Sequence, residues 1–323
     1  MTILMIFFFL LQLVAIPVLS PLAVGIIRKI KAHMQGRVGA SVLQPYYDLW
    51  KLFHKDEVIS EDATWIFRFA PYLIFAVSVA VGIAVPMVTA VPAAFPGIER
   101  LSFLALSDFL VVIYLFALMT FFLALLGIET GSGFGGFGAA REMMVAALAE
   151  GGLLFSLLVA SVIAQSGNLM GIVVNLQMMP LETLFPLLIA FVGFAIALLA
   201  ENSRFPVDNP ATHLELTMIH EAMILEHSGK RLALLEWAAA NKLLIFIALG
   251  ANIFFPWGVA LQADALPGLA LALVVFAAKA AVLLAGIAVI ESTMAKFRIF
   301  RVPDLLFTSL VLGIIALSIS ITF

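Results

Sequence analysis

The sequence contains no cysteine, and this absence excludes several kinds of site. A chain without thiols forms no disulfide, holds no zinc through cysteine and ligates no iron–sulfur cluster with cysteine. Charged residues are also scarce, at 11%, where a soluble domain has about 25%. The net charge of −3 gives no indication of nucleic-acid binding. We also find no internal repeat, so the inverted-repeat pattern of many transporters is missing.

Apolar residues make up 64% of the 323 residues, and they gather in long runs. A helix needs about 20 apolar residues to cross the hydrocarbon core, whereas barrel strands are about 10 residues long. Lipid also leaves no partner for free backbone groups. We therefore predict an all-α polytopic membrane helix bundle, a single integral membrane domain over 1–323. The eight expected transmembrane helices are 2–27, 70–90, 103–127, 143–165, 182–201, 242–262, 268–290 and 305–322.

The first run, 2–27, lacks a basic start and a small-residue cleavage site, so we expect a retained helix and not a signal peptide. The basic residues then predict the orientation. With both termini outside, four cytoplasmic loops hold 15 of the 17 Lys and Arg residues. There are seven in 28–69, one in 128–142, four in 202–241 together with Lys242, and three in 291–304. This asymmetry predicts a multi-pass protein of the cell inner membrane with its charged side in the cytoplasm.

Two of these loops, 28–69 and 202–241, run to about 40 residues, a length that usually carries function or secondary structure. The first contains an apolar stripe between Tyr46 and Phe53. The stripe suits an amphipathic helix on the membrane surface, or equally a docking surface for a soluble partner.

Ionisable residues inside predicted spans are the first candidates for function, because each costs several kcal/mol unless it is paired or hydrated. Glu150 and Lys279 lie near the middle of their spans and would form either a structural pair or part of a hydrated proton path. Glu129, Glu142 and Glu201 lie near span ends, where they would line the same path or sit among lipid headgroups.

The segment 201–241 is the richest in polar groups. Its acids include Asp208, Glu215, Glu221 and Glu226, interleaved with apolar residues from 214 to 225. The intervals of six and five residues between the last three spread them around a helix instead of along one stripe. A helix beside an acid-lined internal cavity would show this pattern, and so would a solvated helix, although its apolar residues argue against the latter.

Three motif-like patterns carry no function. His213, His220 and His227 recur every seven residues, about 10 Å apart along a helix, which is too far for one metal ion. His220-Glu221 begins like a zinc-protease motif, but the second histidine is missing at Ile224. The 131–136 glycines match a dinucleotide pattern yet join two membrane helices instead of following a strand. We therefore predict no metal ligands and no catalytic residues.

Three stretches resemble one family. They are GRVGASVLQPYYDLWKL at 36–52, GAAREMM at 138–144 with Glu150, and AENSRFPVDNP at 200–210, followed by Glu215-Leu216 and 226–229. The sequence resembles the membrane subunit of NADH:quinone oxidoreductase that is called subunit 1 in mitochondria, and its relatives in membrane-bound group 4 nickel–iron hydrogenases. Helix number and loop lengths fit over nearly the whole chain.

The departures from the pattern of the NADH:quinone oxidoreductase subunit point to one branch. Ala211, His213 and His227 replace two acids and a tyrosine, and Ala40 stands where proline is usual. The stretch 209–221 looks closer to the membrane subunits of hydrogenase-4 and formate hydrogenlyase. These changes argue against quinone binding.

The resemblance implies a subunit that binds no cofactor of its own and couples electron transfer in a peripheral arm to proton or sodium movement. Expected partners are an iron–sulfur small subunit and a large catalytic subunit with a nickel–iron centre, together with antiporter-like membrane subunits and lipid. We assign to the interface with the peripheral arm Arg37, Gln44, Asp48, Lys51 and Arg204. We assign to the proton path Glu129, Glu142, Glu150, Glu201, Asp208, Glu215, Glu221, Glu226 and Lys279.

Two other functions are kept as alternatives. In a quinone-reducing complex, a chamber beneath the loops 28–69 and 202–241 would admit a quinone. A stand-alone secondary cation transporter fits less well, since the chain has no repeat and loads its charge on one side.

Overall fold

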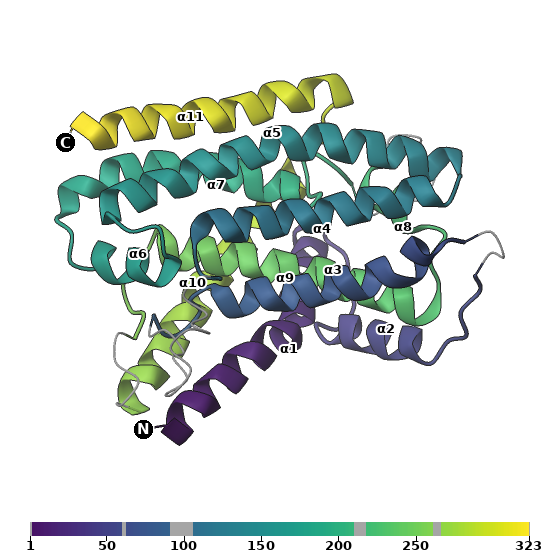
Figure 1. The fold of residues 1–323 in the computed structure, drawn as a ribbon, viewed down its shortest axis with the longest axis horizontal. Helices are drawn as coiled ribbons and strands as arrows, with labels where there is room; N and C mark the ends of the chain where they lie inside the picture. Colours follow the sequence, from purple (N-terminus) through teal and green to yellow (C-terminus); the bar gives the residue numbers. More distant parts are fainter. Residues whose placement is uncertain (1, 60–62, 91–105, 210–217, 261–265, 323) are drawn as a thin grey trace.

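The computed structural model describes residues 2–59, 63–90, 106–209, 218–260 and 266–322. Within these ranges the chain is a helix bundle in which eight helices are long and apolar enough to span a membrane, so the predicted all-α membrane bundle is confirmed (Figure 1). The α-helices are α1 (Thr2–Met34), α2 (Gln44–Phe53), α3 (Trp65–Ala84), α4 (Phe109–Glu129), α5 (Gly133–Ala164), α6 (Leu169–Leu176), α7 (Leu184–Glu201), α8 (His220–Ile224), α9 (Gly229–Ile253), α10 (Leu266–Thr293) and α11 (Val302–Thr322).

Three of these helices, α1, α5 and α9, extend furthest into regions predicted as loops. Helix α5 begins at Gly133, where the Ser132 hydroxyl accepts a hydrogen bond from the Gly135 N–H (3.1 Å) and so caps the helix. Helix α9 begins at Gly229, 13 residues before the predicted start at Lys242. Its first turns carry charges that bond to neighbouring segments, including Arg231 to Glu57. Helix α1 continues to Met34.

Helix α9 lies at the centre of the bundle. In an apolar stretch of 18 residues in the α9 span 78% of residues are buried, against 22% in the corresponding stretch of the span that includes α11. The start of α1 and the end of α11 lie on the same side of the molecule (Figure 1). The short helices α2 and α8 lie at the opposite end, where the chain carries most of its charge.

Small residues allow α5, α7 and α11 to pack closely. A Cβ atom on Gly152 would collide with the Ser309 hydroxyl, and one on Gly193 would lie 3.0 Å from the Ser309 carbonyl. The same hydroxyl donates to the Gly193 carbonyl at 2.7 Å. Small residues and interhelical hydrogen bonds are the usual means of helix association in lipid, where burial of apolar surface gives no driving force.

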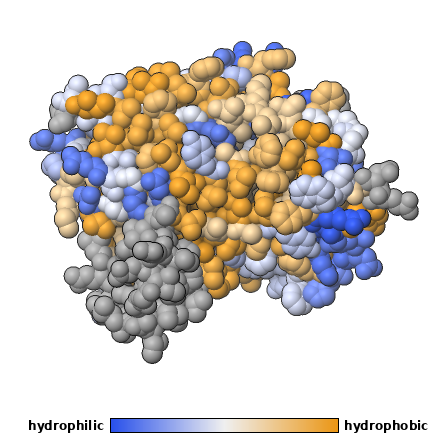
Figure 2. All heavy atoms as spheres, viewed as in Figure 1, coloured by the Kyte–Doolittle hydropathy of each residue, from blue (hydrophilic) through white to orange (hydrophobic). Residues whose placement is uncertain are grey.

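The outside of the bundle is apolar. The middle of the face in Figure 2 is mostly hydrophobic, and hydrophilic patches gather toward its two ends. Large apolar side chains are exposed on most long helices, for example Phe69, Leu118, Val192 and Val282. Helix α2, which contains the predicted apolar stripe, packs on α1 and α9 but leaves Trp50 and Tyr47 exposed.

Candidate functional site: a charged cavity at one end of the bundle

A cavity of about 780 Å³ lies where α1, α2, α5, α7, α8 and α9 meet. Its walls are partly apolar, but they also carry an unusual number of ionisable groups for a membrane protein. The ionisable residues that line it are Arg28, Lys31, Arg37, Asp48, Glu142, Glu201, Arg204, His220, Glu221, Glu236, Lys242 and Glu291.

A buried ion pair joins the end of α7 to the centre of the bundle. The Lys242 ammonium on α9 lies 2.8 Å from Glu201 Oε2, and both side chains are almost fully buried. The ammonium also lies 3.4 Å from the Thr120 hydroxyl and 5.9 Å from the centre of the Phe116 ring. The second carboxylate oxygen, Glu201 Oε1, is buried without a hydrogen-bond partner among the described residues. One acceptor therefore stays available beside the pair.

Two acids on α5 continue from this pair. Glu142 is 4% exposed and interacts electrostatically with Lys242 and Glu201, and its Oε2 atom also has no partner in the described part of the chain. Glu150 follows about two turns further along α5, is half-buried, and interacts with the same two residues. Both predicted acids thus interact electrostatically with one buried pair, although only Glu142 lines the cavity.

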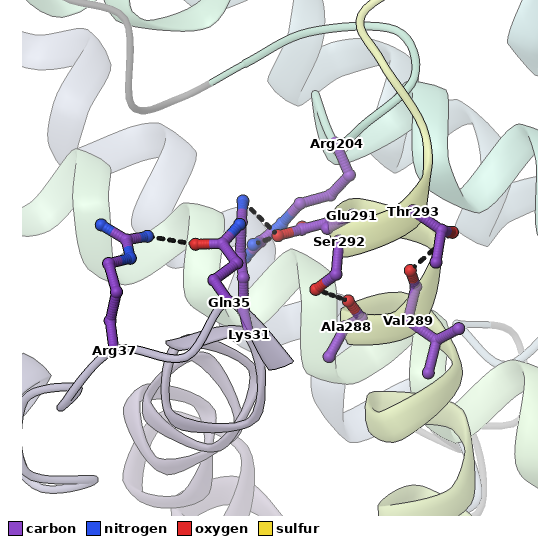
Figure 3. A network of polar contacts seen from close by, with 9 residues as sticks. All are labelled: Lys31, Gln35, Arg37, Arg204, Ala288, Val289, Glu291, Ser292 and Thr293. Carbon is purple, nitrogen blue, oxygen red and sulfur yellow. Dashed lines mark hydrogen bonds and ion pairs between the residues drawn. The ribbon is translucent and has the colours of Figure 1, made fainter. Parts of the chain in front are cut away.

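A second buried network lies at the cytoplasmic end predicted for α10 (Figure 3). The Glu291 carboxylate accepts from Lys31 at 3.1 Å and from Arg204 at 3.0 Å, so it links α1, α10 and the segment after α7. Its side chain is 2% exposed. Arg37 lies beside this network and bonds to Gln35.

Asp208 connects the segment after α7 to the start of α8 and to Lys296. Its carboxylate lies 2.8 Å from the Lys296 ammonium and accepts from the backbone N–H groups of Ile219 (3.1 Å) and His220 (3.3 Å). The residue is 1% exposed. Asp208 thereby fixes the start of α8, which places His220 and Glu221 in the cavity wall.

These two α8 residues have shifted protonation equilibria. Burial, helped by the nearby acids Glu236 and Asp208, raises the pKa of Glu221 to about 7. Burial lowers the pKa of His220 to about 4. Near neutral pH the histidine is therefore uncharged, while the Glu221 carboxyl exchanges its proton readily.

His227 is buried without a hydrogen bond. Its ring stacks on Phe67 at 4.0 Å, and neither ring nitrogen has a partner among the described residues. Burial and the neighbouring Arg231 lower the pKa of His227 to about 4. The preceding acid in the chain, Glu226, is exposed, and Glu215 lies outside the described residues.

The residues predicted for the peripheral-arm interface lie at the mouth of the cavity or on its outer surface. Gln44 donates to Asp48 at 2.9 Å, and Asp48 lies 3.8 Å from Arg28 in a pair that is about half exposed. Arg37 and Lys51 are exposed. Gln44, Asp48 and Lys51 thus lie on α2, and Arg37 precedes it. Arg37, Asp48 and Arg204 line the cavity.

Of the predicted path residues that the structure describes, Glu142, Glu201 and Glu221 line the cavity, whereas Glu129, Glu150, Asp208, Glu226 and Lys279 do not. Glu129, at the end of α4, accepts from the Thr64 N–H at 2.7 Å, immediately before α3 begins. The Lys279 ammonium bonds to Asn252 Oδ1 (3.3 Å) and to the Phe255 carbonyl (2.6 Å) at the end of α9. Lys279 therefore does not form the structural pair with Glu150 that its position in the sequence allowed.

Sequence reasoning missed Glu291, Lys31 and Lys242 as site residues. Glu291 is the single acid at the end of a long apolar run, which was the available signal, but it resembles an ordinary helix-end residue. Lys242 was assigned to a loop end. No metal site was predicted, and within the described ranges no group of three or more His, Asp or Glu residues is placed to hold a metal ion.

Comparisons with known proteins complete the description of the site. A family model described as NADH dehydrogenase matches residues 3–322. Formate hydrogenlyase subunit 4 of Escherichia coli (strain K12) is 33% identical, over 91% of this chain and 92% of that protein. Hydrogenase-4 component C of the same organism is 35% identical, over 91% and 89%. An NADH-quinone oxidoreductase subunit of Anaeromyxobacter dehalogenans (strain 2CP-C) is 27% identical, over 91% and 75%.

Among solved structures, the fold matches a chain of the membrane-bound sulfane sulfur reductase, an archaeal respiratory membrane complex, with a TM-score of 0.80. The two chains are 21% identical, and the match covers 98% of this chain and 99% of that one. This likeness shows that the bundle arrangement is shared.

Proposed function

Because this chain belongs to the NADH dehydrogenase (subunit 1) family, we propose that it is the membrane anchor and energy-coupling subunit of a hydrogenase-type respiratory complex. In this role it links electron transfer in a peripheral arm to proton or sodium translocation across the cell inner membrane. Two similar relatives, formate hydrogenlyase subunit 4 and hydrogenase-4 component C, support this type of complex. The chain itself carries no redox chemistry in this proposal.

The observation that carries the proposal is the buried charge around Glu142, Glu201 and Lys242. Glu201 pairs with the Lys242 ammonium, and Glu142 interacts with both groups electrostatically. The three groups together therefore bear an excess negative charge unless one carboxyl holds a proton. In a medium of low dielectric, a charge that appears nearby shifts such an equilibrium strongly. Electron transfer next to the cavity mouth would therefore move a proton among these groups.

We propose that the path enters at Glu221, passes Glu142 and Glu201, and continues to Glu150 in the membrane. Asp208 acts by holding α8 in place. Glu129 and Lys279 are not part of this path, since both have partners outside the cavity. Exposed Glu226 is also left out.

The expected partners follow from the position of α2. Arg37, Gln44, Asp48 and Lys51 would contact an iron–sulfur small subunit, which itself binds a large subunit with a nickel–iron centre. Antiporter-like membrane subunits would cover part of the apolar belt. Mass spectrometry of the intact complex tests these assignments, and purification of this chain as a functional single protein would contradict them.

Glu142→Gln tests the path directly. In the purified complex we expect electron transfer to continue while the number of ions moved per electron pair falls, because glutamine cannot exchange a proton. Glu226→Gln is the matched control, since this acid is exposed and outside the cavity. Wild-type coupling in Glu142→Gln, with normal assembly, would rule out a proton path through this residue.

A quinone-reducing complex is the second candidate, and the cavity itself favours it. Its volume of about 780 Å³ lies within the usual range for ligand sites, and apolar residues such as Leu49, Leu52 and Met119 line it. Charged groups crowd the remaining wall, which disfavours a neutral quinone. Inhibition of the complex by a quinone-site inhibitor would favour this candidate, and insensitivity would favour the hydrogenase type.

A further inference from the structure

Helix α1 contains a backbone carbonyl that the helix cannot satisfy. Pro21 has no N–H, so the Pro17 carbonyl four residues earlier lacks its usual helical donor. The indole N–H of Trp237 on α9 supplies a hydrogen bond at 2.8 Å, and the Ser20 hydroxyl lies at 3.4 Å. A tryptophan of one helix thus completes the backbone of another at its proline-containing segment.

The same segment is tied to α9 at a second point. The Ser20 hydroxyl donates to the Asn241 side chain at 2.7 Å, and Asn241 in turn donates to Ser78 of α3 at 3.0 Å. Asn241 is fully buried. It immediately precedes Lys242, whose ammonium holds Glu201.

Helix α2 contacts both α1 and α9 near this hydrogen bond. Phe53 lies edge-on to the Trp237 ring, with centroids 6.1 Å apart, and the Tyr46 hydroxyl donates to the Val18 carbonyl of α1. Trp237 therefore contacts both α1 and α2 and lies on the same helix, α9, as Lys242 of the buried ion pair. Five residues, about 7.5 Å along the helix axis, separate Trp237 from Lys242.

We propose that Trp237 is a positioning residue that transmits displacement of α2 and of the proline segment of α1 to the Lys242–Glu201 pair. This inference rests on the proposed coupling function, and it assigns a mechanical connection to Trp237, which does not line the cavity although Pro21 does.

Trp237→Phe in the intact complex removes the N–H and keeps an aromatic ring. We expect electron transfer to persist and the ions moved per electron pair to fall by about twofold or more, since one hydrogen bond shifts an equilibrium by about that factor. Unchanged coupling in this variant would overturn the proposal.

Pro21→Ala separates a local structural role from transmission. This substitution gives position 21 an N–H, so the Pro17 carbonyl is satisfied within α1 even without Trp237. We expect Pro21→Ala alone to keep wild-type coupling. We expect the double variant with Trp237→Phe to recover the thermal stability of the complex but not its coupling.

Each other outcome counts against the inference. Recovery of coupling in the double variant would show that Trp237 only completes the α1 backbone. Failure of the double variant to assemble would show that this hydrogen bond is not what Trp237 contributes, and lost coupling in Pro21→Ala alone would leave Trp237 without a role of its own. Glu201→Gln, measured in parallel, separates the two proposals: wild-type coupling in that variant would instead overturn the proposed function.

Discussion

Glu201 and Lys242 form an ion pair of 2.8 Å between the end of α7 and the centre of α9, and both side chains are buried. The pair joins two helices whose pairing residues are 41 positions apart in the sequence. Because Glu142 interacts with both partners, the pair is also the point where the acids of α5 meet the cavity.

Lys242→Met should destabilise the complex strongly. The variant leaves Glu201 buried without its cation, and breaking a buried pair in this way costs about 3–5 kcal/mol. Thermal unfolding of the purified complex measures the effect. Lys279→Met serves as a control for the loss of a lysine in a span, since Lys279 bonds to neutral groups only. An equal loss of thermal stability in both variants would show that the ion pair itself does not stabilise the complex.

Glu291→Gln should lower the amount of assembled complex, because it leaves the buried cations Lys31 and Arg204 without their shared carboxylate. Asp48→Asn is the contrasting variant. Its pair with Arg28 is 3.8 Å long and about half exposed, and such surface pairs contribute about 0–1 kcal/mol. Blue native electrophoresis and thermal stability would report both. We expect a clear loss for Glu291→Gln and almost none for Asp48→Asn.

The eight spans could be predicted from the sequence because each is a long apolar run, and the family because three motifs retain its pattern. The start of α9 could not be predicted, because the charges of Lys230, Arg231 and Glu236 are typical of a loop. In the structure Arg231 pairs with Glu57, and Glu236 lines the cavity.

The ion-pair partners within the site also could not be predicted from the sequence. Nothing local indicates that Lys242 reaches Glu201, or that Glu291 holds Lys31, since the partners are 41 and 260 positions apart. The same limit explains why Lys279 was considered as a partner of Glu150. Hydropathy placed both near mid-membrane, whereas packing brings Lys279 to the end of α9.

Glu221 should give the complex a pH dependence near neutrality. Its pKa is raised to about 7 in the folded protein, so the folded state binds a proton more tightly than the unfolded state. Stability from this group is therefore fully present at acidic pH below its ordinary pKa and is lost as pH rises to about 7. In Glu221→Gln we expect this part of the pH profile of thermal stability to flatten. An identical profile in wild type and variant would contradict the assignment.

His227→Phe should maintain or raise stability. The substitution keeps an aromatic ring against Phe67 and removes two buried nitrogen atoms that lack hydrogen bonds among the described residues. An unsatisfied buried polar group costs about 1–3 kcal/mol, so a modest gain in thermal stability is expected. His227→Ala is the control that loses the stacking contact. A marked loss in His227→Phe would show that the imidazole itself has a partner in the assembled complex.

The most direct test is the number of ions moved per electron pair by the complex that carries both Glu201→Gln and Lys242→Met. This double substitution removes both charges together, so it avoids the unpaired buried carboxylate of Lys242→Met and should assemble. Measured in proteoliposomes, it should transfer electrons while moving few or no ions. Full ion movement by this neutral variant would contradict the claim that the buried charges of the cavity couple the two processes.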